Sequence, residues 1–142
     1  MSKFTDNAGR EWVFTITVDD VRRVRKKLEV DLLDVDVFPQ LASDPILLAD
    51  VLFVLCLPQA DADGITDEDF GRGLGGDAID EATEAVLDAL VNFSRSAKRA
   101  TLRKVIDKQK ALEARGLEAA ETYLASGQAE KEMDAAIKKA GL

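Results

Sequence analysis

A long, almost uninterrupted apolar segment limits how this chain can fold. It runs from Ile46 to Leu57, and Asp50 is the one charged residue within it. Such a helix is apolar on nearly every side, which is typical of a helix at the centre of a core or shared with another subunit. It is shorter than the ~20 residues of a membrane-spanning helix, so we expect no membrane association. The expected N-cap, first residue and end of this helix are, in order, Ser43 or Asp44, Pro45, and Pro58.

The first residues predict a β-hairpin. Residues 4–6 and 11–18 flank Asn7-Ala8-Gly9-Arg10, in which Asn and Gly tolerate the positive φ of a tight turn. Apolar side chains alternate along the second arm, which is typical of a strand with one buried face. The alternating residues are Trp12, Phe14, Ile16 and Val18. A hairpin alone is marginal in water, so we expect this one to pack on the helices that follow.

Helical spacing recurs through the rest of the chain. Asp19 or Asp20 can cap a first helix, Thr66 a short helix with an acidic first turn, and Asp77 a longer one. The longer helix carries an apolar stripe at spacings of three and four. The stripe consists of Ile79, Ala82, Val86, Leu90 and Phe93. We expect a break or bend over residues 92–96.

These patterns predict a mainly α-helical fold in which an N-terminal β-hairpin packs on a small helical bundle. The helical pattern resumes at Lys98, and we expect the core to close by about residue 112, which gives one α-rich domain over residues 1–112. The stretch 117–142 is rich in Ala, Glu and Lys and has few apolar residues to bury. Residues 113–142 are therefore predicted to form a helical C-terminal extension that frays or docks on a partner.

The composition excludes several kinds of catalysis. The 142 residues contain no histidine, so a Ser-His-Asp triad, a Cys-His pair or a histidine-ligated zinc cannot be built. The carboxylates lie in helix caps and on helix faces, and no lysine lies in an apolar run that would activate it. We expect a protein that is not an enzyme and that binds no cofactor or metal. Weak Mg²⁺ binding by Asp61, Asp63 and Asp67 is the alternative.

Two segments match ligand-binding motifs only in part. If Gly64 takes the sixth position of an EF-hand loop, Phe70 falls where a bidentate Glu is required. Residues 71–76 have the letters G-x-G-x-x-G, but acidic residues precede them instead of an apolar strand. We expect these glycines to form a tight turn between two helices.

Cys56 is the single cysteine and lies in the apolar segment. We interpret it as a small buried hydrophobic residue, with a redox role as the alternative. It cannot form an internal disulfide, and a polar stretch instead of an apolar signal segment follows Met1. Both features predict a cytoplasmic location.

Charge is divided unevenly along the chain. The net charge of -8 comprises -1 over residues 1–36, -11 over residues 37–90 and +4 over residues 91–142. An acidic chain is a poor ligand for nucleic acid, which we do not expect as a partner. The basic residues between positions 22 and 27 form a solvated face or a site for an acidic protein. The acidic middle and basic tail are two solvated faces, or they pair within one molecule or between copies in a homo-oligomer.

Several short motifs follow one another in a recognisable order over about residues 4–105. The later ones are Asp44-Pro45-Ile46-Leu47-Leu48, the apolar run to Leu57, residues 64–70, Gly76-Asp77-Ala78 and Leu90-Val91-Asn92-Phe93. The opening ones are Phe4, Asp6, Gly9-Arg10, Trp12 and Val21-Arg22-Arg23-Val24. In this order they resemble the tail assembly chaperones of long-tailed bacteriophages and prophages.

The resemblance implies a non-catalytic, mainly helical protein that binds the tape measure protein and helps to recruit tail tube subunits around it. We predict that a groove along the apolar helix binds the client. The predicted partner-binding residues are Leu47, Leu48, Val51, Leu52, Leu55, Phe70 and Phe93. One alternative is that these residues are simply core. The alternative function is a helical adaptor or structural subunit of another protein assembly that acts through its charged surfaces.

Overall fold

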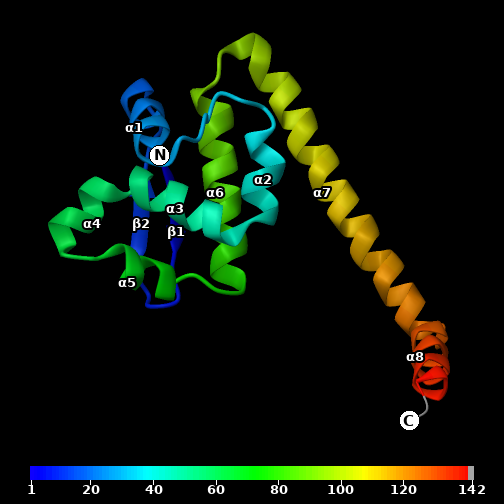
Figure 1. The fold of residues 1–142 in the computed structure, drawn as a ribbon. Helices are drawn as coiled ribbons and strands as arrows, with labels where there is room; N and C mark the ends of the chain where they lie inside the picture. The colour runs from blue at the N-terminus through cyan, green and yellow to red at the C-terminus, as the bar shows by residue number, and fades with distance from the viewer. Residues whose placement is uncertain (141–142) are drawn as a thin grey trace. The chain divides into compact units, whose positions relative to one another are not determined.

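The protein is described by a computed structural model over residues 1–140, apart from the side chains of Ala97 and Ala129. The fold is mainly helical, with an N-terminal two-stranded antiparallel hairpin and a long C-terminal helix (Figure 1), which confirms the predicted fold class. The chain divides into two compact units, residues 1–106 and 107–142. The predicted boundary of the first domain lies at residue 112, six residues later than the boundary between these units.

The hairpin consists of β1 (Ser2–Thr5) and β2 (Glu11–Phe14), which pair antiparallel with Phe4 opposite Trp12. Phe4, Trp12 and Phe14 are buried, and their neighbours on the strands are exposed or partly exposed. The alternation along the second arm therefore marks the buried face correctly as far as Ile16, whereas Val18 is 64% exposed.

Helix α1 (Val18–Leu28) begins earlier, and β2 ends earlier, than predicted. Thr17 is the N-cap: its Oγ1 accepts a hydrogen bond from the backbone N–H of Asp20, and Asp20 Oδ2 accepts one from the N–H of Thr17 at 2.9 Å. This reciprocal pair is a capping box, which satisfies two free N–H groups at once. The predicted cap at Asp19 or Asp20 is therefore wrong, and so is a strand that continues to residue 18.

Helices α2 (Val37–Ser43) and α3 (Pro45–Leu55) follow one another with a bend of 109°. Asp44 caps α3, because its Oδ1 accepts the N–H groups of Ile46 at 3.0 Å and Leu47 at 3.2 Å. Helix α2 is not predicted from the sequence. Among the described residues, no single helix is long and apolar enough to cross a membrane, and the bent pair α2–α3 passes that test by length and composition only.

The two short helices that follow are α4 (Leu57–Asp63) and α5 (Asp67–Arg72). The prediction that Pro58 ends the apolar helix is wrong, because Pro58 lies in the first turn of α4. Proline is tolerated there, since the N–H that it lacks would have no helical partner. The predicted cap of α5 is confirmed: Thr66 Oγ1 accepts a hydrogen bond from the N–H of Asp69 at 3.2 Å.

Three longer helices complete the chain: α6 (Asp77–Phe93), α7 (Ser96–Ala125) and α8 (Gln128–Lys139). The predicted cap at Asp77 is wrong by one residue, because Asp77 is already the first residue of α6. The end of α6 and the start of α7 both fall within residues 92–96, where the break is predicted. The first unit contains α7 up to Ile106, and the rest of α7 belongs with α8 to the second unit.

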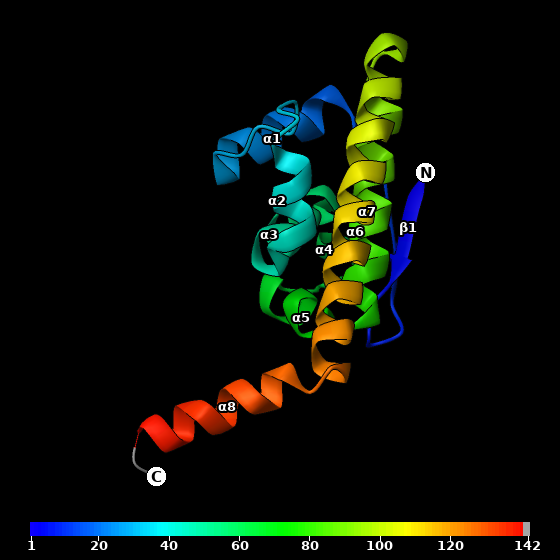
Figure 2. The ribbon, with the colours of Figure 1, turned by 90° about the vertical axis from the view of Figure 1, so that its right-hand side faces the viewer.

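The core lies in the first unit, where β1 runs along α6 (Figure 2) and α3 contacts α1, α2 and α5. Phe70 is surrounded by aromatic rings, with the ring centre of Trp12 at 4.9 Å and that of Phe4 at 6.3 Å. Leu102 and Ile106 of α7 close this core. Every side chain that the structure describes beyond residue 106 is exposed or partly exposed.

Candidate functional site

The seven predicted partner-binding residues lie in the core of the first unit or against it. Five of them are at most 4% exposed, namely Leu48, Val51, Leu52, Leu55 and Phe70. Leu47 and Phe93 are half-buried and pack against the core. In this conformation, the five buried side chains therefore present almost no surface to a partner. They lie in the interior of the first unit, next to a cleft that is open to solvent.

This cleft lies between α1, α3 and α5 and has a volume of about 330 Å³. The three helices can be followed in Figure 1. Its apolar lining consists of Leu28, Ala49, Phe53, Val54 and Phe70. Three carboxylates also line it, those of Asp50, Asp67 and Glu68. The site combines an apolar floor with an acidic rim.

Neighbouring elements hold the floor of the cleft in place. The ring centres of Phe53 and Phe70 are 5.5 Å apart, so the half-buried ring of Phe53 rests on the buried ring of Phe70. The Thr66 cap fixes the start of α5, which positions Phe70. Ile46 is 74% exposed and lies four and seven residues before Asp50 and Phe53, which places it on the same face of α3. The apolar surface therefore extends along α3 beyond the cleft.

Few cations lie close enough to offset the negative charge of the acidic rim. No cationic partner is recorded for the exposed carboxylates of Asp50 and Asp67 within the described part of the chain, and Asp67 Oδ1 accepts the N–H of Glu68 at 3.0 Å. Glu68 Oε2 lies 3.7 Å from Arg72 Nη2, and both side chains are largely exposed. An exposed ion pair of this length contributes little. The rim therefore favours a ligand that carries Lys or Arg beside an apolar group.

A second polar cluster, around Asp6, supports the structure. Asp6 is 5% exposed, and its carboxylate accepts hydrogen bonds from Arg10 and from the Trp12 indole. Burial alone would raise the pKa of Asp6, but the hydrogen bonds from Trp12 and Arg10 outweigh it and lower the pKa below its usual value. The backbone N–H of Asn7 donates to the carbonyl of Gly73 at 2.7 Å. The cluster thus joins the hairpin turn to the end of α5.

The glycine-rich segment 71–76 spans the end of α5 and the turn before α6, as predicted. Cys56 is 1% exposed, and burial raises the pKa of its thiol to about 12, which disfavours the reactive thiolate. Among the described residues, no group of three or more Cys, Asp or Glu is placed to hold a metal ion, and Asp61, Asp63 and Asp67 form no such group.

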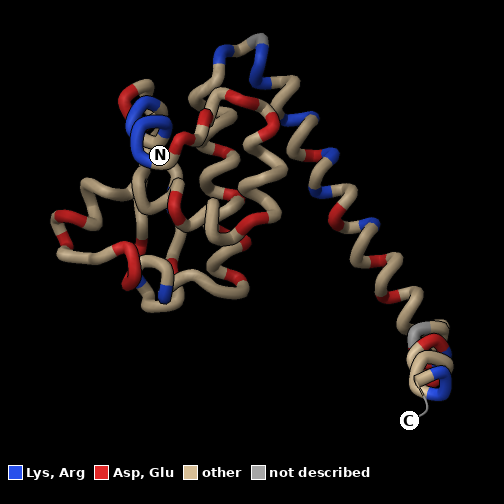
Figure 3. Tube along the Cα trace, in the orientation of Figure 1, with Lys and Arg blue, Asp and Glu red and all other residues tan. Residues whose placement is uncertain are grey.

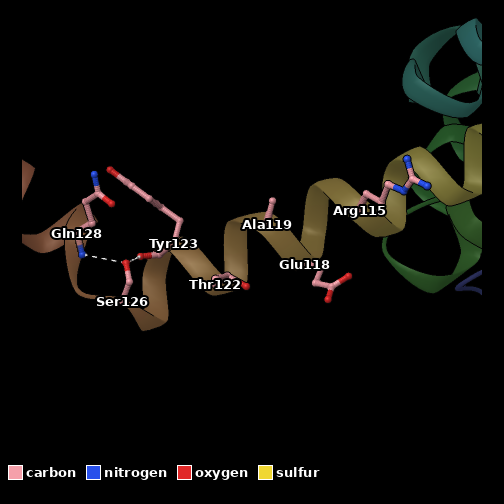
Figure 4. Close-up of a pocket in the computed structure, with 7 residues that line it drawn as sticks. All are labelled: Arg115, Glu118, Ala119, Thr122, Tyr123, Ser126 and Gln128. Atoms are coloured by element: carbon pink, nitrogen blue, oxygen red, sulfur yellow. Dashed lines mark hydrogen bonds between the residues drawn. The ribbon is translucent and has the colours of Figure 1, made fainter.

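The second unit has an open pocket where α7 meets α8, lined by residues between Arg115 and Gln128 (Figure 4). Gln128 donates its backbone N–H to Ser126 Oγ at 3.3 Å, and Ser126 donates to the carbonyl of Tyr123 at 2.7 Å. Tyr123 also donates its hydroxyl to Glu132, which raises the pKa of Tyr123. These contacts stabilise the turn between the two helices, and their residues are otherwise exposed.

Leu28 and Phe53 are not among the partner-binding residues predicted from the sequence. Both are partly buried, pack against the core and line the cleft. A helix that is apolar on all sides contains no periodic signal for which face is covered, and α3 is such a helix. The polar residue Asp50 is the one signal in the sequence, since it marks the face that reaches solvent. That face includes Ile46 and Phe53.

Comparisons with family models, curated proteins and solved structures find no match to this chain. The apolar cleft, its acidic rim and the distribution of charge are therefore the structural observations on which a function rests.

Proposed function

We propose that this chain is a tail assembly chaperone of a long-tailed bacteriophage or prophage, which binds the tape measure protein and helps tail tube assembly in the host-cell cytoplasm. The proposal starts from the resemblance over residues 4–105. The structural observation that supports it is the cleft between α1, α3 and α5, which offers an apolar floor to a helical client.

A chaperone for a long apolar client needs an open apolar surface and a charged exterior that prevents its own aggregation. Phe53 and Ile46 supply the apolar surface on one face of α3, and the net charge of -8 supplies the exterior. A client helix would place apolar side chains at i, i+3 and i+4 over Phe53. Lys or Arg residues beside them would pair with Asp50 at the rim.

A second candidate is a helical adaptor or structural subunit of another assembly. The observation that favours it is a set of apolar side chains on the second unit that are at least 46% exposed. They are Leu112, Leu117, Leu124, Met133 and Ile137. An adaptor of this kind would bind its partner through residues 107–142, and a chaperone of the proposed kind through the cleft.

Co-expression tests the main proposal. The tape measure protein encoded beside this chain is expressed alone and together with it, and the soluble fraction is measured in each case. We expect a soluble complex that contains both proteins. A tape measure protein that is equally insoluble with and without this chain contradicts the proposal.

Two substitutions locate the binding surface. Phe53→Ala removes the floor of the cleft and Asp50→Lys reverses its rim, so each should lower the yield of soluble client. The matched control is Val18→Ala, because Val18 is apolar, 64% exposed and on α1, outside the residues that line the cleft. Circular dichroism checks that each variant is folded. If a chain truncated after residue 106 loses the client while both cleft variants retain it, the adaptor is the better explanation.

A further inference from the structure

The cleft between α1, α3 and α5 carries negative charge on two of its walls. Asp50 comes from α3, and Asp67 and Glu68 come from α5. Among the described residues that line the cleft, none is Lys or Arg. Residues 37–90, which include both walls, contain Arg72 as the single basic residue and twelve acidic ones. Figure 3 shows this excess of acidic positions along α4 and α5.

Nearby cations offset this charge only in part. Arg72 follows the acidic residues of α5, and its Nη1 lies 3.0 Å from Asp69 Oδ1. Its Nη2 lies 3.7 Å from Glu68 Oε2, so one arginine is divided between two carboxylates. Lys27 precedes Leu28 on α1, but it is not among the residues that line the cleft. The rim can therefore pair with a cation that a partner supplies.

An aromatic ring lies beside these carboxylates. Phe53 comes three residues after Asp50 on α3, so the two side chains share one face of the helix. The half-buried ring of Phe53 rests on Phe70, with 5.5 Å between the ring centres, and it also lines the cleft. A cation that pairs with Asp50 is therefore placed beside the ring, whose face attracts positive charge.

The hairpin turn of the same protein holds an arginine in a comparable setting. Arg10 Cζ lies 5.9 Å from the centre of the Trp12 ring, within the range of a cation–π contact. Arg10 Nε also donates to Asp6 Oδ2 at 2.8 Å. One guanidinium thus contacts a ring with its face and a carboxylate with an N–H group. The cleft contains the same two components, a ring and carboxylates.

We propose that the cleft binds the side chain of a single arginine of the partner, with its guanidinium beside the Phe53 ring and paired with Asp50 and the carboxylates of α5. The volume of about 330 Å³ is at the lower end for ligand sites, which suits one long side chain. The apolar stem of the arginine would lie along Leu28 and Val54. A helical client would lie on the apolar surface that continues to Ile46 and insert this side chain. The inference deepens the proposed function and rests on it for the identity of the partner.

The geometry of the cleft favours arginine over lysine. A guanidinium is planar, so it can stack on a ring while its N–H groups reach carboxylates on both walls. It is also more weakly hydrated than an ammonium, so it leaves water more readily. The ammonium of lysine is a compact, strongly hydrated charge that pairs with a carboxylate but does not stack. The cleft should therefore distinguish the two cations, which an acidic surface without a ring would not do.

Three helical peptides that differ at one position test this proposal. Each is rich in alanine and glutamine, has about 20 residues, and carries two leucines at i and i+4 beside a variable residue, which is Arg, Lys or Gln. NMR titration of the isotope-labelled full chain measures each affinity at about 0.05 M NaCl. The arginine peptide should bind about two- to fivefold more tightly than the lysine peptide, and the glutamine peptide should bind most weakly. Equal affinities, or no binding, overturn the proposal.

Two substitutions separate the ring from the charge. Phe53→Leu keeps an apolar side chain but removes the ring, so the arginine peptide should bind about two- to fivefold more weakly and the glutamine peptide should change by less than about twofold. Asp50→Asn should weaken both cationic peptides and leave the glutamine peptide unchanged. The matched control is Asp80→Asn, at an exposed carboxylate of α6 outside the cleft, which should bind like the unmodified chain. The amide spectrum shows whether each variant is folded.

The outcomes distinguish this inference from the proposed function. If the client is kept soluble on co-expression while both substitutions leave the arginine peptide unaffected, the arginine assignment is wrong and the chaperone proposal stands. If the arginine peptide binds selectively and both substitutions weaken it, but the client stays insoluble, the chaperone proposal fails and the cleft binds an arginine of another partner. Binding that depends on Asp50 but not on Phe53 would reduce the cleft to an acidic surface, which also overturns the inference.

Discussion

The indole Nε1 of Trp12 donates a hydrogen bond to Oδ2 of Asp6 over 2.9 Å, where Trp12 is 0% and Asp6 5% exposed. The same carboxylate accepts the N–H groups of Ala8 at 3.0 Å and Arg10 at 2.9 Å. Arg10 in turn donates from Nη2 to the carbonyl of Asp69 at 3.0 Å. The carboxylate of Asp6 and its partner Arg10 therefore connect the hairpin turn, the aromatic core and helix α5 in a single hydrogen-bond network.

Replacing this carboxylate should destabilise the protein. In Asp6→Asn the side chain keeps its shape but loses its charge, and its amide NH₂ faces N–H donors. We expect the free energy of unfolding to fall by about 1–3 kcal/mol, measured by urea denaturation. The control is Asp63→Asn, at an exposed residue with no recorded partner, which should stay within about 0.5 kcal/mol. Equal effects of the two substitutions would contradict the role of Asp6.

The same network predicts how stability depends on pH. The pKa of Asp6 lies below its usual value in the folded protein, because hydrogen bonds from Trp12 and Arg10 outweigh the effect of burial. The ionised form therefore stabilises the fold above the pKa of the unfolded chain, about 3.9, and this stabilisation is lost as pH falls through the lower folded pKa. Unfolding curves of the unmodified chain and of Asp6→Asn should converge below about pH 4. If the difference in the free energy of unfolding between the two proteins stays constant from about pH 7 to about pH 2.5, this assignment is wrong.

Two glycines on either side of Arg72 provide a matched pair. A Cβ at Gly73 would lie 2.8 Å from Asp6 Oδ2 and 3.1 Å from Arg10 Nη2, so Gly73→Ala should displace the network and cost about 1–3 kcal/mol. A Cβ at Gly71 meets nothing within 4 Å, and Gly71 lies in α5. Gly71→Ala should therefore be neutral or should stabilise by up to about 1 kcal/mol. Thermal unfolding of both variants measures the difference.

Local patterns in the sequence predict the elements that local chemistry determines. The alternation through Trp12 and Phe14 finds the hairpin, and side-chain caps at Asp44 and Thr66 begin two helices where expected. Each signal is complete within a few residues, so no distant contact is needed to interpret it. The aromatic face of the hairpin is buried for the same reason.

Other elements depend on contacts that such patterns do not contain. Helix α4 contains Pro58 in its first turn, and a proline also suits a position just after a helix end. The helix is held by Gln59, whose side chain donates to the carbonyl of Glu11 at 2.8 Å and accepts the N–H of Val13 at 3.1 Å. Helix α2 has a proline in its first turn and only a short apolar pattern. The accessible face of α3 is likewise decided by packing, which is why most of the partner-binding residues predicted on α3 lie on its buried side.

The thiol of Cys56 should react slowly in the folded protein. It is 1% exposed, and burial raises its pKa to about 12, so the reactive thiolate is scarce near neutral pH. Labelling with a thiol reagent at about pH 8 should therefore be much slower in buffer than in urea, where the chain is unfolded. Mass spectrometry over time measures both rates. Fast labelling of the folded protein would contradict the burial of Cys56.

The first unit should fold without the second. Its core ends with Leu102 and Ile106, and among the described residues every side chain beyond them is exposed or partly exposed. Removing residues 107–142 therefore sacrifices almost no buried apolar area, which is the main source of stability. We expect the thermal midpoint of residues 1–106 to lie within about 4 °C of that of the full chain. The control is a chain truncated after residue 99, which lacks Leu102 and Ile106 and should melt at a clearly lower temperature. Equal losses in both truncations would show that the second unit stabilises the first.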